Sequence, residues 1–227
     1  MEVSATKKGM PLIMMPSGHL TPGFKKIINV GYGAIRKQAQ DWLDEHTNNL
    51  MGDDATKALF YAAVVICCDA ASTLLRRYAA KCLEKAATCP DPKRRAELES
   101  MADSLNWISE NPCRTFREAC QAAITYQYIL RLSYIHDVGS FGRFDQYTWP
   151  FLKRDLEEGR LTLDEAQEIV DCFFMKINSM YGGGAGDGKL AQIIGIGNTY
   201  LHTTIGGVDP QTGEDASNPV TYMVLES

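Results

Sequence analysis

The feature that most restricts this fold is a single convincing β-strand, HTTIGGV at residues 202–208, among six or seven predicted helices. Elsewhere along the chain, apolar residues recur at helical spacing. So few strands are unusual for a chain that is 45% hydrophobic. We therefore expect the chain to be a segment of a longer protein, with the strands that complete the fold elsewhere.

Capping residues and prolines define the predicted helices. Thr21 and Pro22 begin the first, Asp53 and Asp54 cap the second, and Asp91 caps the third. The runs TFRE at 115–118 and TLDE at 162–165 have the form of capping boxes. The predicted helices cover residues 22–46, 54–87, 92–110, 116–134, 163–177 and 219–227. The last helix is still apolar where the chain stops, which supports the interpretation of a segment cut from a longer protein.

Composition excludes several classes of partner. The net charge is -5 and the basic pairs are scattered, so we expect no nucleic acid and no anionic membrane. The longest apolar run, residues 58–68, is much shorter than the roughly 20 residues of a membrane span and predicts a helix buried in protein. Residues 1–20 contain no clean signal peptide. The cysteines show no C-x-x-C or metal-ligand spacing, which predicts reduced thiols in a cytosolic protein and no metal site.

Two local patterns resemble nucleotide or metal sites. The run GGAGDGKL at 183–190 nearly matches the phosphate-binding loop G-x-x-x-x-G-K-[ST]. Leu190 stands where the magnesium-binding hydroxyl belongs and a helix precedes the run, so we interpret it as a surface loop. None of the four histidines pairs at i, i+4 with another ligand-type residue, which argues against zinc. His19, in the glycine-flanked loop SGHL, either faces a pocket or has a structural role.

The run SFGRFDQYTWP at 140–150 places Ser140, Arg143 and Asp145 on one short connector beside aromatic residues. One interpretation is an Arg–carboxylate pair that fixes the connector between two helices. The other is a polar wall that lines a cavity. The residues alone favour the structural interpretation without excluding the other, and they indicate no reaction.

Five runs in one order carry a family resemblance. They are SGHLTPGFKKIINVGYGAIRKQAQDWL, RRYAAKCLEKA, RRAELESMADSLNWISENPCRTFREACQA, GSFGRFDQYTWPFLKRDLEEGRLTLDEAQEIVDCFFMKIN and TTIGGVDPQTGEDASNPVTYMVLES. Together they resemble the N-terminal, pyruvate formate-lyase-type domain of glycyl radical enzymes, over residues 17–227. Their wording is closer to the dehydratase and C–X lyase branches than to pyruvate formate-lyase itself.

The resemblance implies an α/β fold, a ten-stranded barrel with helices outside that is made of two five-stranded halves. Residues 1–227 would be an incomplete pyruvate formate-lyase-type domain, part of the first half and predominantly helical. The family stores a radical on a glycine, installed by a separate S-adenosylmethionine iron–sulfur activating enzyme, and passes it to a cysteine. Both residues lie beyond Ser227 in the family order. We therefore assign no catalytic residue and no bound cofactor here, and expect the chain alone to be inactive.

The resemblance also supplies substrate-pocket candidates. His19 matches a histidine that lies near the substrate hydroxyls in diol-type dehydratases and would assist loss of hydroxide. Ser140, Arg143 and Asp145 match the family connector that borders the barrel interior. Asp137 departs from the family, in which a GHS-type run tends to place a substrate-contacting serine nearby. An acid at this position predicts a cationic or amino-bearing substrate.

These observations predict a fragment of a cytoplasmic, anaerobic glycyl radical lyase or dehydratase. Its reaction would be radical dehydration, or C–X or C–C cleavage, of a small polar metabolite. The expected partners are the substrate, the activating enzyme and, for the full-length protein, a second copy of itself. The alternative is a non-catalytic binding or assembly protein derived from the same family. A nucleotide-binding module is the weakest hypothesis.

Overall fold

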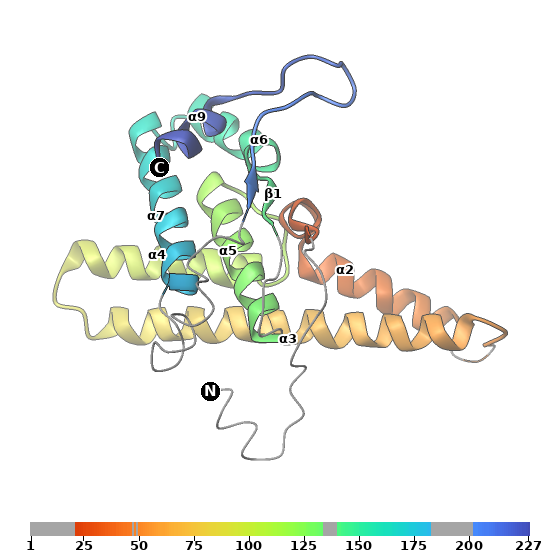
Figure 1. Ribbon diagram of the computed structural model, residues 1–227. Helices are drawn as coiled ribbons and strands as arrows, with labels where there is room; N and C mark the ends of the chain where they lie inside the picture. The colour runs from red at the N-terminus through yellow and green to blue at the C-terminus, as the bar shows by residue number, and fades with distance from the viewer. Residues whose placement is uncertain (1–20, 47, 49, 134–139, 183–201) are drawn as a thin grey trace, which may run out of the picture. The chain divides into compact units, whose positions relative to one another are not determined.

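The computed structural model describes residues 21–46, 48, 50–133, 140–182 and 202–227. The chain divides into two compact units, residues 25–122 and residues 1–24 with 123–227. Helices dominate the described part of both units (Figure 1). This confirms the prediction of a predominantly helical segment.

Long helices form most of the unit at residues 25–122. They are α2 (Phe24–His46), α3 (Asp54–Ala87), α4 (Pro92–Ile108) and the first turns of α5 (Phe116–Ser133). Figure 1 shows α3 and α4 side by side. Each buries residues at three- and four-residue intervals, as a helix with one core-facing side requires: Ala71, Leu75 and Ala79 in α3, and Leu98, Ala102 and Leu105 in α4.

The helix α2 is interrupted at Gly31, which adopts φ 78° and ψ 161°. Two backbone groups on either side of the interruption pair with the loop after α4. The Ile28 carbonyl accepts from the Cys113 N–H at 2.9 Å, and the Gly33 N–H donates to the Glu110 carbonyl at 2.8 Å. The predicted helix at 22–46 is therefore confirmed at its end but not at its start or in its continuity, because α2 begins at Phe24 and Gly31 interrupts it with a positive φ that glycine permits.

The predicted caps have mixed outcomes. Asp91 accepts from the Lys93 N–H at 3.0 Å, and Thr162 and Glu165 form both halves of a capping box. At residues 115–118 one of the two capping-box hydrogen bonds is present, which the Glu118 N–H donates to Thr115 Oγ1 at 3.2 Å. The prediction for Asp53 is wrong, since its side chain makes no cap hydrogen bond.

The apolar run at 58–68 lies within α3, but the prediction that it is buried is wrong within the described residues. Leu59, Phe60 and Ile66 are 76%, 63% and 68% exposed. Among the described residues, α3 alone is long and apolar enough to cross a membrane by length and composition, with a mean hydropathy of 1.9 in its most apolar window. Only 22% of that window is buried. The apolar composition therefore predicts the helix correctly but predicts its burial incorrectly.

The other unit combines helices with a short parallel sheet. Its helices are α5 from residue 123 onward, α6 (Phe144–Glu157), α7 (Leu163–Gly182) and α9 (Pro219–Glu226). β1 (Gly142–Arg143) pairs with β2 (Thr203–Thr204), so that Gly142 is opposite Thr203. The predicted strand at 202–208 is thus confirmed in place but is shorter than expected.

An aromatic cluster forms the core of this second unit. Phe141 lies edge-on to Phe173, and Phe144 stacks on Phe173 with 4.6 Å between ring centroids. Phe144 begins α6, which includes most of the run that the sequence analysis interpreted as a connector between helices. That interpretation is wrong for residues 144–150, which are helical although Pro150 lies inside the helix and proline normally argues against one.

Candidate functional site

The connector predicted to carry site residues begins with Ser140, whose hydroxyl fixes the approach to β1. Ser140 Oγ donates to the His202 carbonyl at 2.6 Å and accepts from the Gly142 N–H at 3.0 Å. The Phe141 N–H also donates to the His202 carbonyl, at 2.9 Å. The Phe141 N–H therefore extends the contact between the two strands by one position, and the Ser140 hydroxyl reinforces it at the same carbonyl.

Arg143 binds main-chain oxygens in the turn that follows β2. One terminal nitrogen donates to the Gly206 carbonyl at 2.8 Å and the other donates to the Val208 carbonyl at 3.1 Å. Its Nε is buried without a partner. Gly206 and Gly207 have φ values of 62° and 88°, a conformation that favours glycine and turns both carbonyls toward other groups.

Asp145 lies at the start of α6 with no exposed surface. Its Oδ2 accepts from the Gly206 N–H at 2.7 Å and from the Thr221 hydroxyl at 2.6 Å. Thr221 is also the third helical residue of α9, where it completes a capping box with Asn218. One carboxylate oxygen therefore joins α6, the turn after β2 and the beginning of α9. The other, Oδ1, is buried without a partner.

The predicted direct pair between Arg143 and Asp145 is wrong. In the described part of the chain the two side chains bind Gly206 from its two backbone groups, the carbonyl and the N–H, and do not form an ion pair with each other. Both side chains still fix this segment, as the structural interpretation expected. Their shared partner is Gly206, which lies 63 residues after Arg143 and 61 residues after Asp145.

Sequence reasoning missed Gly206, Thr221 and the side chain of Asn218 as members of this cluster. The glycine pair at 206–207 was the available signal, since adjacent glycines after a strand often mark a positive-φ turn. The candidates His19 and Asp137, and the run at 183–190, lie outside the described residues.

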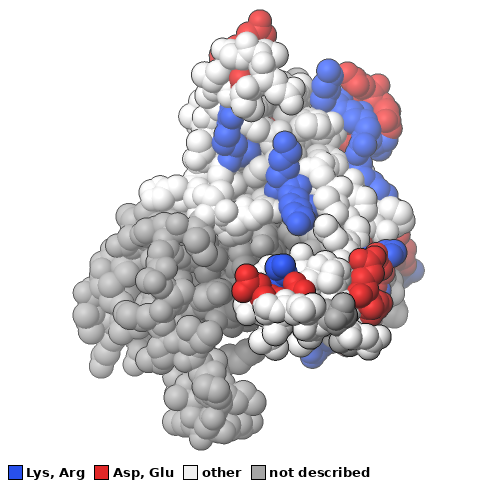
Figure 2. Space-filling view, turned by 90° about the vertical axis from the view of Figure 1, so that its right-hand side faces the viewer, with Lys and Arg blue, Asp and Glu red and all other residues white. Residues whose placement is uncertain are grey.

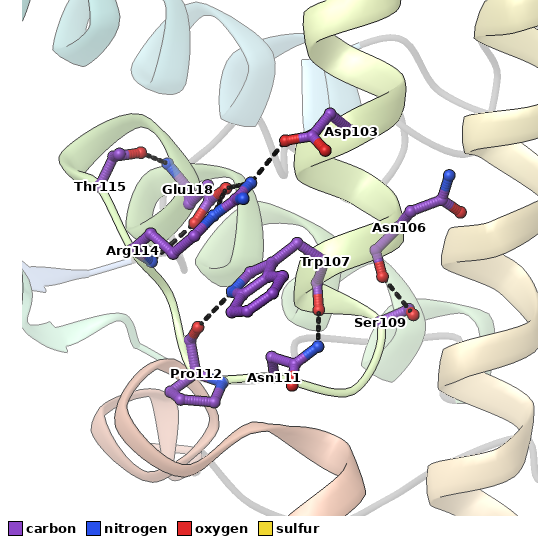
Figure 3. Close-up of polar contacts among 9 residues, drawn as sticks. All are labelled: Asp103, Asn106, Trp107, Ser109, Asn111, Pro112, Arg114, Thr115 and Glu118. Atoms are coloured by element: carbon purple, nitrogen blue, oxygen red, sulfur yellow. Dashed lines mark hydrogen bonds and ion pairs between the residues drawn. The ribbon is translucent and has the colours of Figure 1, made fainter.

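A second polar cluster lies at the end of α4 and the start of α5 (Figure 3). The Arg114 guanidinium donates to Glu118 at 2.5 and 2.9 Å and to Asp103 at 2.6 Å, and it lies 4.5 Å from the centre of the Trp107 ring. Glu118 is buried and also accepts from the Arg114 N–H at 2.6 Å. The hydrogen bonds that it donates to Glu118 raise the pKa of the Arg114 guanidinium, which therefore stays charged. These contacts hold a loop and indicate no reaction.

A polar cavity of about 330 Å³ also lies within residues 25–122. It is lined by Tyr32, Gly33, Arg36, Cys68, Asp69, Ser72, Ser109 and Glu110. Arg36 Nε lies 2.5 Å from Asp69 Oδ1, and Glu110 is paired with Arg76. The charges that line this cavity are therefore already neutralised by partners, and we assign it no ligand.

Neither the cysteines nor the acidic residues of the described part of the chain form a metal site. All seven cysteines are free thiols. Burial raises the pKa of the Cys113 thiol to about 12 and also raises that of Cys120, so both remain protonated and unreactive at neutral pH. Figure 2 shows blue and red side chains scattered among uncharged ones on the face drawn. That distribution differs from the clustered positive surface of a nucleic-acid interface.

The family of the chain is decided by one comparison. The family model described as Pyruvate formate lyase-like matches residues 9–227. The chain belongs to this family. This match, with the relatives that follow, confirms the predicted resemblance to the dehydratase and lyase branch of glycyl radical enzymes.

Two curated relatives of this pyruvate formate lyase-like chain are named as a lyase and as a dehydratase. Isethionate sulfite-lyase of Nitratidesulfovibrio vulgaris is 36% identical over 209 residues, which cover 90% of this chain and 24% of that protein. (2S)-3-sulfopropanediol dehydratase of Klebsiella oxytoca is 30% identical over 213 residues, covering 92% and 25%. The chain thus spans about a quarter of the length of these relatives.

Solved structures of the same family agree with this fold. Glycerol-bound glycerol dehydratase from Clostridium butyricum matches with a TM-score of 0.82 and 32% identity, over 92% of this chain and 26% of that one. A glycyl radical enzyme from Archaeoglobus fulgidus matches with a TM-score of 0.76 and 28% identity, over 92% and 26%. The predicted ten-stranded barrel itself stays a prediction, because the described residues contain only the β1–β2 sheet.

Proposed function

We propose that this chain is part of a glycyl radical enzyme that dehydrates a small polar metabolite or cleaves a C–X or C–C bond in it. The match of the pyruvate formate lyase-like family over residues 9–227 carries the proposal. It is supported by relatives named as a sulfite-lyase and as dehydratases. Since the chain covers about a quarter of those relatives, the activity is proposed for the whole protein.

The role proposed for the β1–β2 connector is to position a wall of the substrate cavity. Arg143 and Asp145 hold the two backbone groups of Gly206, and Ser140 holds the carbonyl of His202. Each of the three polar side chains binds at least one main-chain group, which suits a positioning role better than substrate contact. A rigid wall matters for radical chemistry, because the intermediate must be kept from water and from other hydrogen donors.

Two pocket candidates remain proposals that rest on the family alone. His19 would lie near the substrate hydroxyls and assist loss of hydroxide. Asp137 would favour a cationic or amino-bearing substrate over a neutral polyol. Comparing the full-length enzyme with its Asp137→Asn variant tests this, and equal kcat/KM for an amino substrate in both would contradict it.

The radical residues are proposed to lie outside this chain. The family order places the thiyl cysteine and the radical glycine after the region that corresponds to Ser227, so we expect the chain alone to be inactive. An S-adenosylmethionine iron–sulfur enzyme would install the radical. The whole protein is proposed to act as a homodimer in the cytoplasm of cells that live without oxygen.

The decisive experiment uses the full-length protein, prepared without oxygen together with its activating enzyme, S-adenosylmethionine and a reductant. We expect the electron paramagnetic resonance doublet of a glycyl radical. Isethionate, glycerol and trans-4-hydroxy-L-proline would then be offered in turn, with sulfite or dehydrated product measured. A protein that never acquires the radical would support the alternative, a non-catalytic binding or assembly protein.

A further inference from the structure

The hydroxyl of Thr221 forms hydrogen bonds that run in one direction. Thr221 Oγ1 accepts from the Asn218 N–H at 2.9 Å and donates to Asp145 Oδ2 at 2.6 Å. A hydroxyl carries one proton, and here that proton points at the carboxylate because the Asn218 N–H can only donate. All three residues are buried. The hydroxyl therefore connects the N-cap of α9 to Asp145 in a fixed orientation.

The same carboxylate oxygen holds the turn after β2. Asp145 Oδ2 also accepts from the Gly206 N–H at 2.7 Å, and Arg143 donates to the Gly206 carbonyl at 2.8 Å. Hydrogen bonds thus run from the start of α9 through Thr221 and Asp145 to Gly206. Buried hydrogen bonds that share members strengthen one another and make a segment rigid. Loss of the Thr221 hydroxyl should therefore loosen the turn at Gly206, although the two residues share no hydrogen bond.

The methyl group of Thr221 also lies near this turn. A Cβ placed on Gly206 would lie 3.9 Å from Thr221 Cγ2, the distance of an ordinary van der Waals contact. Valine at this position keeps the methyl group and removes the hydroxyl, whereas serine keeps the hydroxyl and removes the methyl group. The two substitutions therefore separate the hydrogen bond from the packing.

We propose that Thr221 is a positioning residue for the substrate cavity of the whole enzyme. Its hydroxyl orients the Asp145 carboxylate, which in turn sets the direction of the turn at Gly206. This inference rests on the proposed function, in which the β1–β2 connector positions a wall of that cavity. Thr221 acts from behind the wall, since it is buried and donates its proton to Asp145. Displacing the groups that position a substrate by about 1 Å can lower a rate about a hundredfold.

The first test compares Thr221→Val with Thr221→Ser in the full-length enzyme, activated without oxygen. The substrate is whichever of isethionate, glycerol and trans-4-hydroxy-L-proline the unmodified enzyme converts. Thr221→Val should lower kcat/KM per glycyl radical at least about tenfold, whereas Thr221→Ser should stay within about twofold of the unmodified enzyme. Electron paramagnetic resonance should count the same radical content in all three proteins.

Thr162→Val is the matched control for the lost helix cap. Thr162 is also the threonine of a capping box, at the beginning of α7, and its hydroxyl binds Glu165. Both Thr→Val changes remove a cap, so an effect of stability alone would appear in both. Assays well below the unfolding temperature of every variant should give Thr162→Val the kcat/KM of the unmodified enzyme.

The second test measures the turn directly in this chain and needs no radical. Exchange of the Gly206 N–H with deuterated water, followed by nuclear magnetic resonance, should be at least about tenfold faster in Thr221→Val than in the unmodified chain. Thr221→Ser and Thr162→Val should leave this rate unchanged.

Either of two results overturns the positioning role. One is an unchanged kcat/KM or an unchanged Gly206 exchange rate in Thr221→Val. The other is an equal loss in Thr221→Val and Thr221→Ser, which would assign the effect to packing. An unmodified enzyme that never acquires the radical, or converts none of the three compounds, contradicts the proposed function and with it any role of Thr221 in catalysis. The Gly206 exchange rates distinguish that failure from a failure of the hydrogen-bond network.

Discussion

The Thr221 hydroxyl donates a 2.6 Å hydrogen bond to Asp145 Oδ2, which joins two buried residues 76 positions apart in the chain. The same oxygen accepts from the Gly206 N–H at 2.7 Å. Removing this acceptor would leave both buried donors without a partner. This carboxylate is therefore expected to stabilise α6, α9 and the turn after β2 as a group.

Asp145→Ala should lower the free energy of unfolding by about 3 kcal/mol, since the Gly206 N–H and the Thr221 hydroxyl lose their acceptor. Thr221→Val should cost less, about 1 to 2 kcal/mol, because it removes one donor and half of a capping box. Urea unfolding measures both. Asp164→Ala is the matched control, as Asp164 is an exposed aspartate near the start of α7. Equal losses for Asp145→Ala and the control would contradict the role of Asp145.

Glu118→Gln should destabilise the chain by about 2 to 3 kcal/mol. The neutral amide leaves Arg114 with one carboxylate instead of two and cannot accept from the Arg114 N–H and guanidinium with the same strength. Glu97→Gln changes an exposed pair with Arg94 and should cost less than about 0.5 kcal/mol. Thermal unfolding of the two variants compares them directly. A Glu118→Gln loss as small as the control would show that the cluster in Figure 3 is not a stabilising one.

Gly31→Ala should be among the most damaging single changes in residues 25–122. The new Cβ would lie 2.5 Å from the Asn111 carbonyl carbon and from the Glu110 carbonyl oxygen, and the positive φ adds about 1 kcal/mol of its own. Gly159→Ala separates the two effects, because Gly159 also has a positive φ, 67°, but nothing within 4 Å. We expect urea midpoints to fall much further for Gly31→Ala. Similar shifts for both variants would mean that the loop moves away without cost.

Most helices could be predicted from the sequence because apolar spacing and caps are local. The capping box of Thr162 and Glu165 formed as predicted, and so did the cap at Asp91. α6 was missed because Pro150 carries a strong local signal against a helix, which tertiary packing of Phe144 and Leu152 overrides. Burial of the apolar run at 58–68 could not be predicted because apolar composition alone does not show which residues of a helix face the core.

The candidate site was predictable only in part for a similar reason. Ser140, Arg143 and Asp145 all bind the segment that contains β2 and the turn after it, but their role in a substrate pocket stays a prediction. Their partners are mainly main-chain atoms, which carry no side-chain signature in the sequence. A direct ion pair was the simplest interpretation of an Arg and an Asp two positions apart, whereas in the structure the two side chains bind the carbonyl and the N–H of Gly206.

Alkaline pH should destabilise the chain through its buried thiols. Burial raises the pKa of Cys113 from 9.0 to about 12 in the folded chain. The unfolded chain therefore releases this proton first as the pH rises, so the stabilising contribution is complete below pH 9.0 and is lost progressively between 9.0 and about 12. Cys113 should add up to about 1.4 kcal/mol of lost stability per pH unit in that range.

Urea unfolding at several pH values between about 8 and about 10.5, with a phosphine reductant present, measures this slope. Cys113→Ala should give a shallower loss of stability with pH than the unmodified chain, although it is less stable at every pH because it leaves a small cavity. Cys172→Ala is the control, since Cys172 is exposed. Lysines and tyrosines titrate equally in all three proteins, so only the difference in slope reports the buried thiol. Parallel slopes for Cys113→Ala and the unmodified chain would show that the thiol is accessible to water in the folded state.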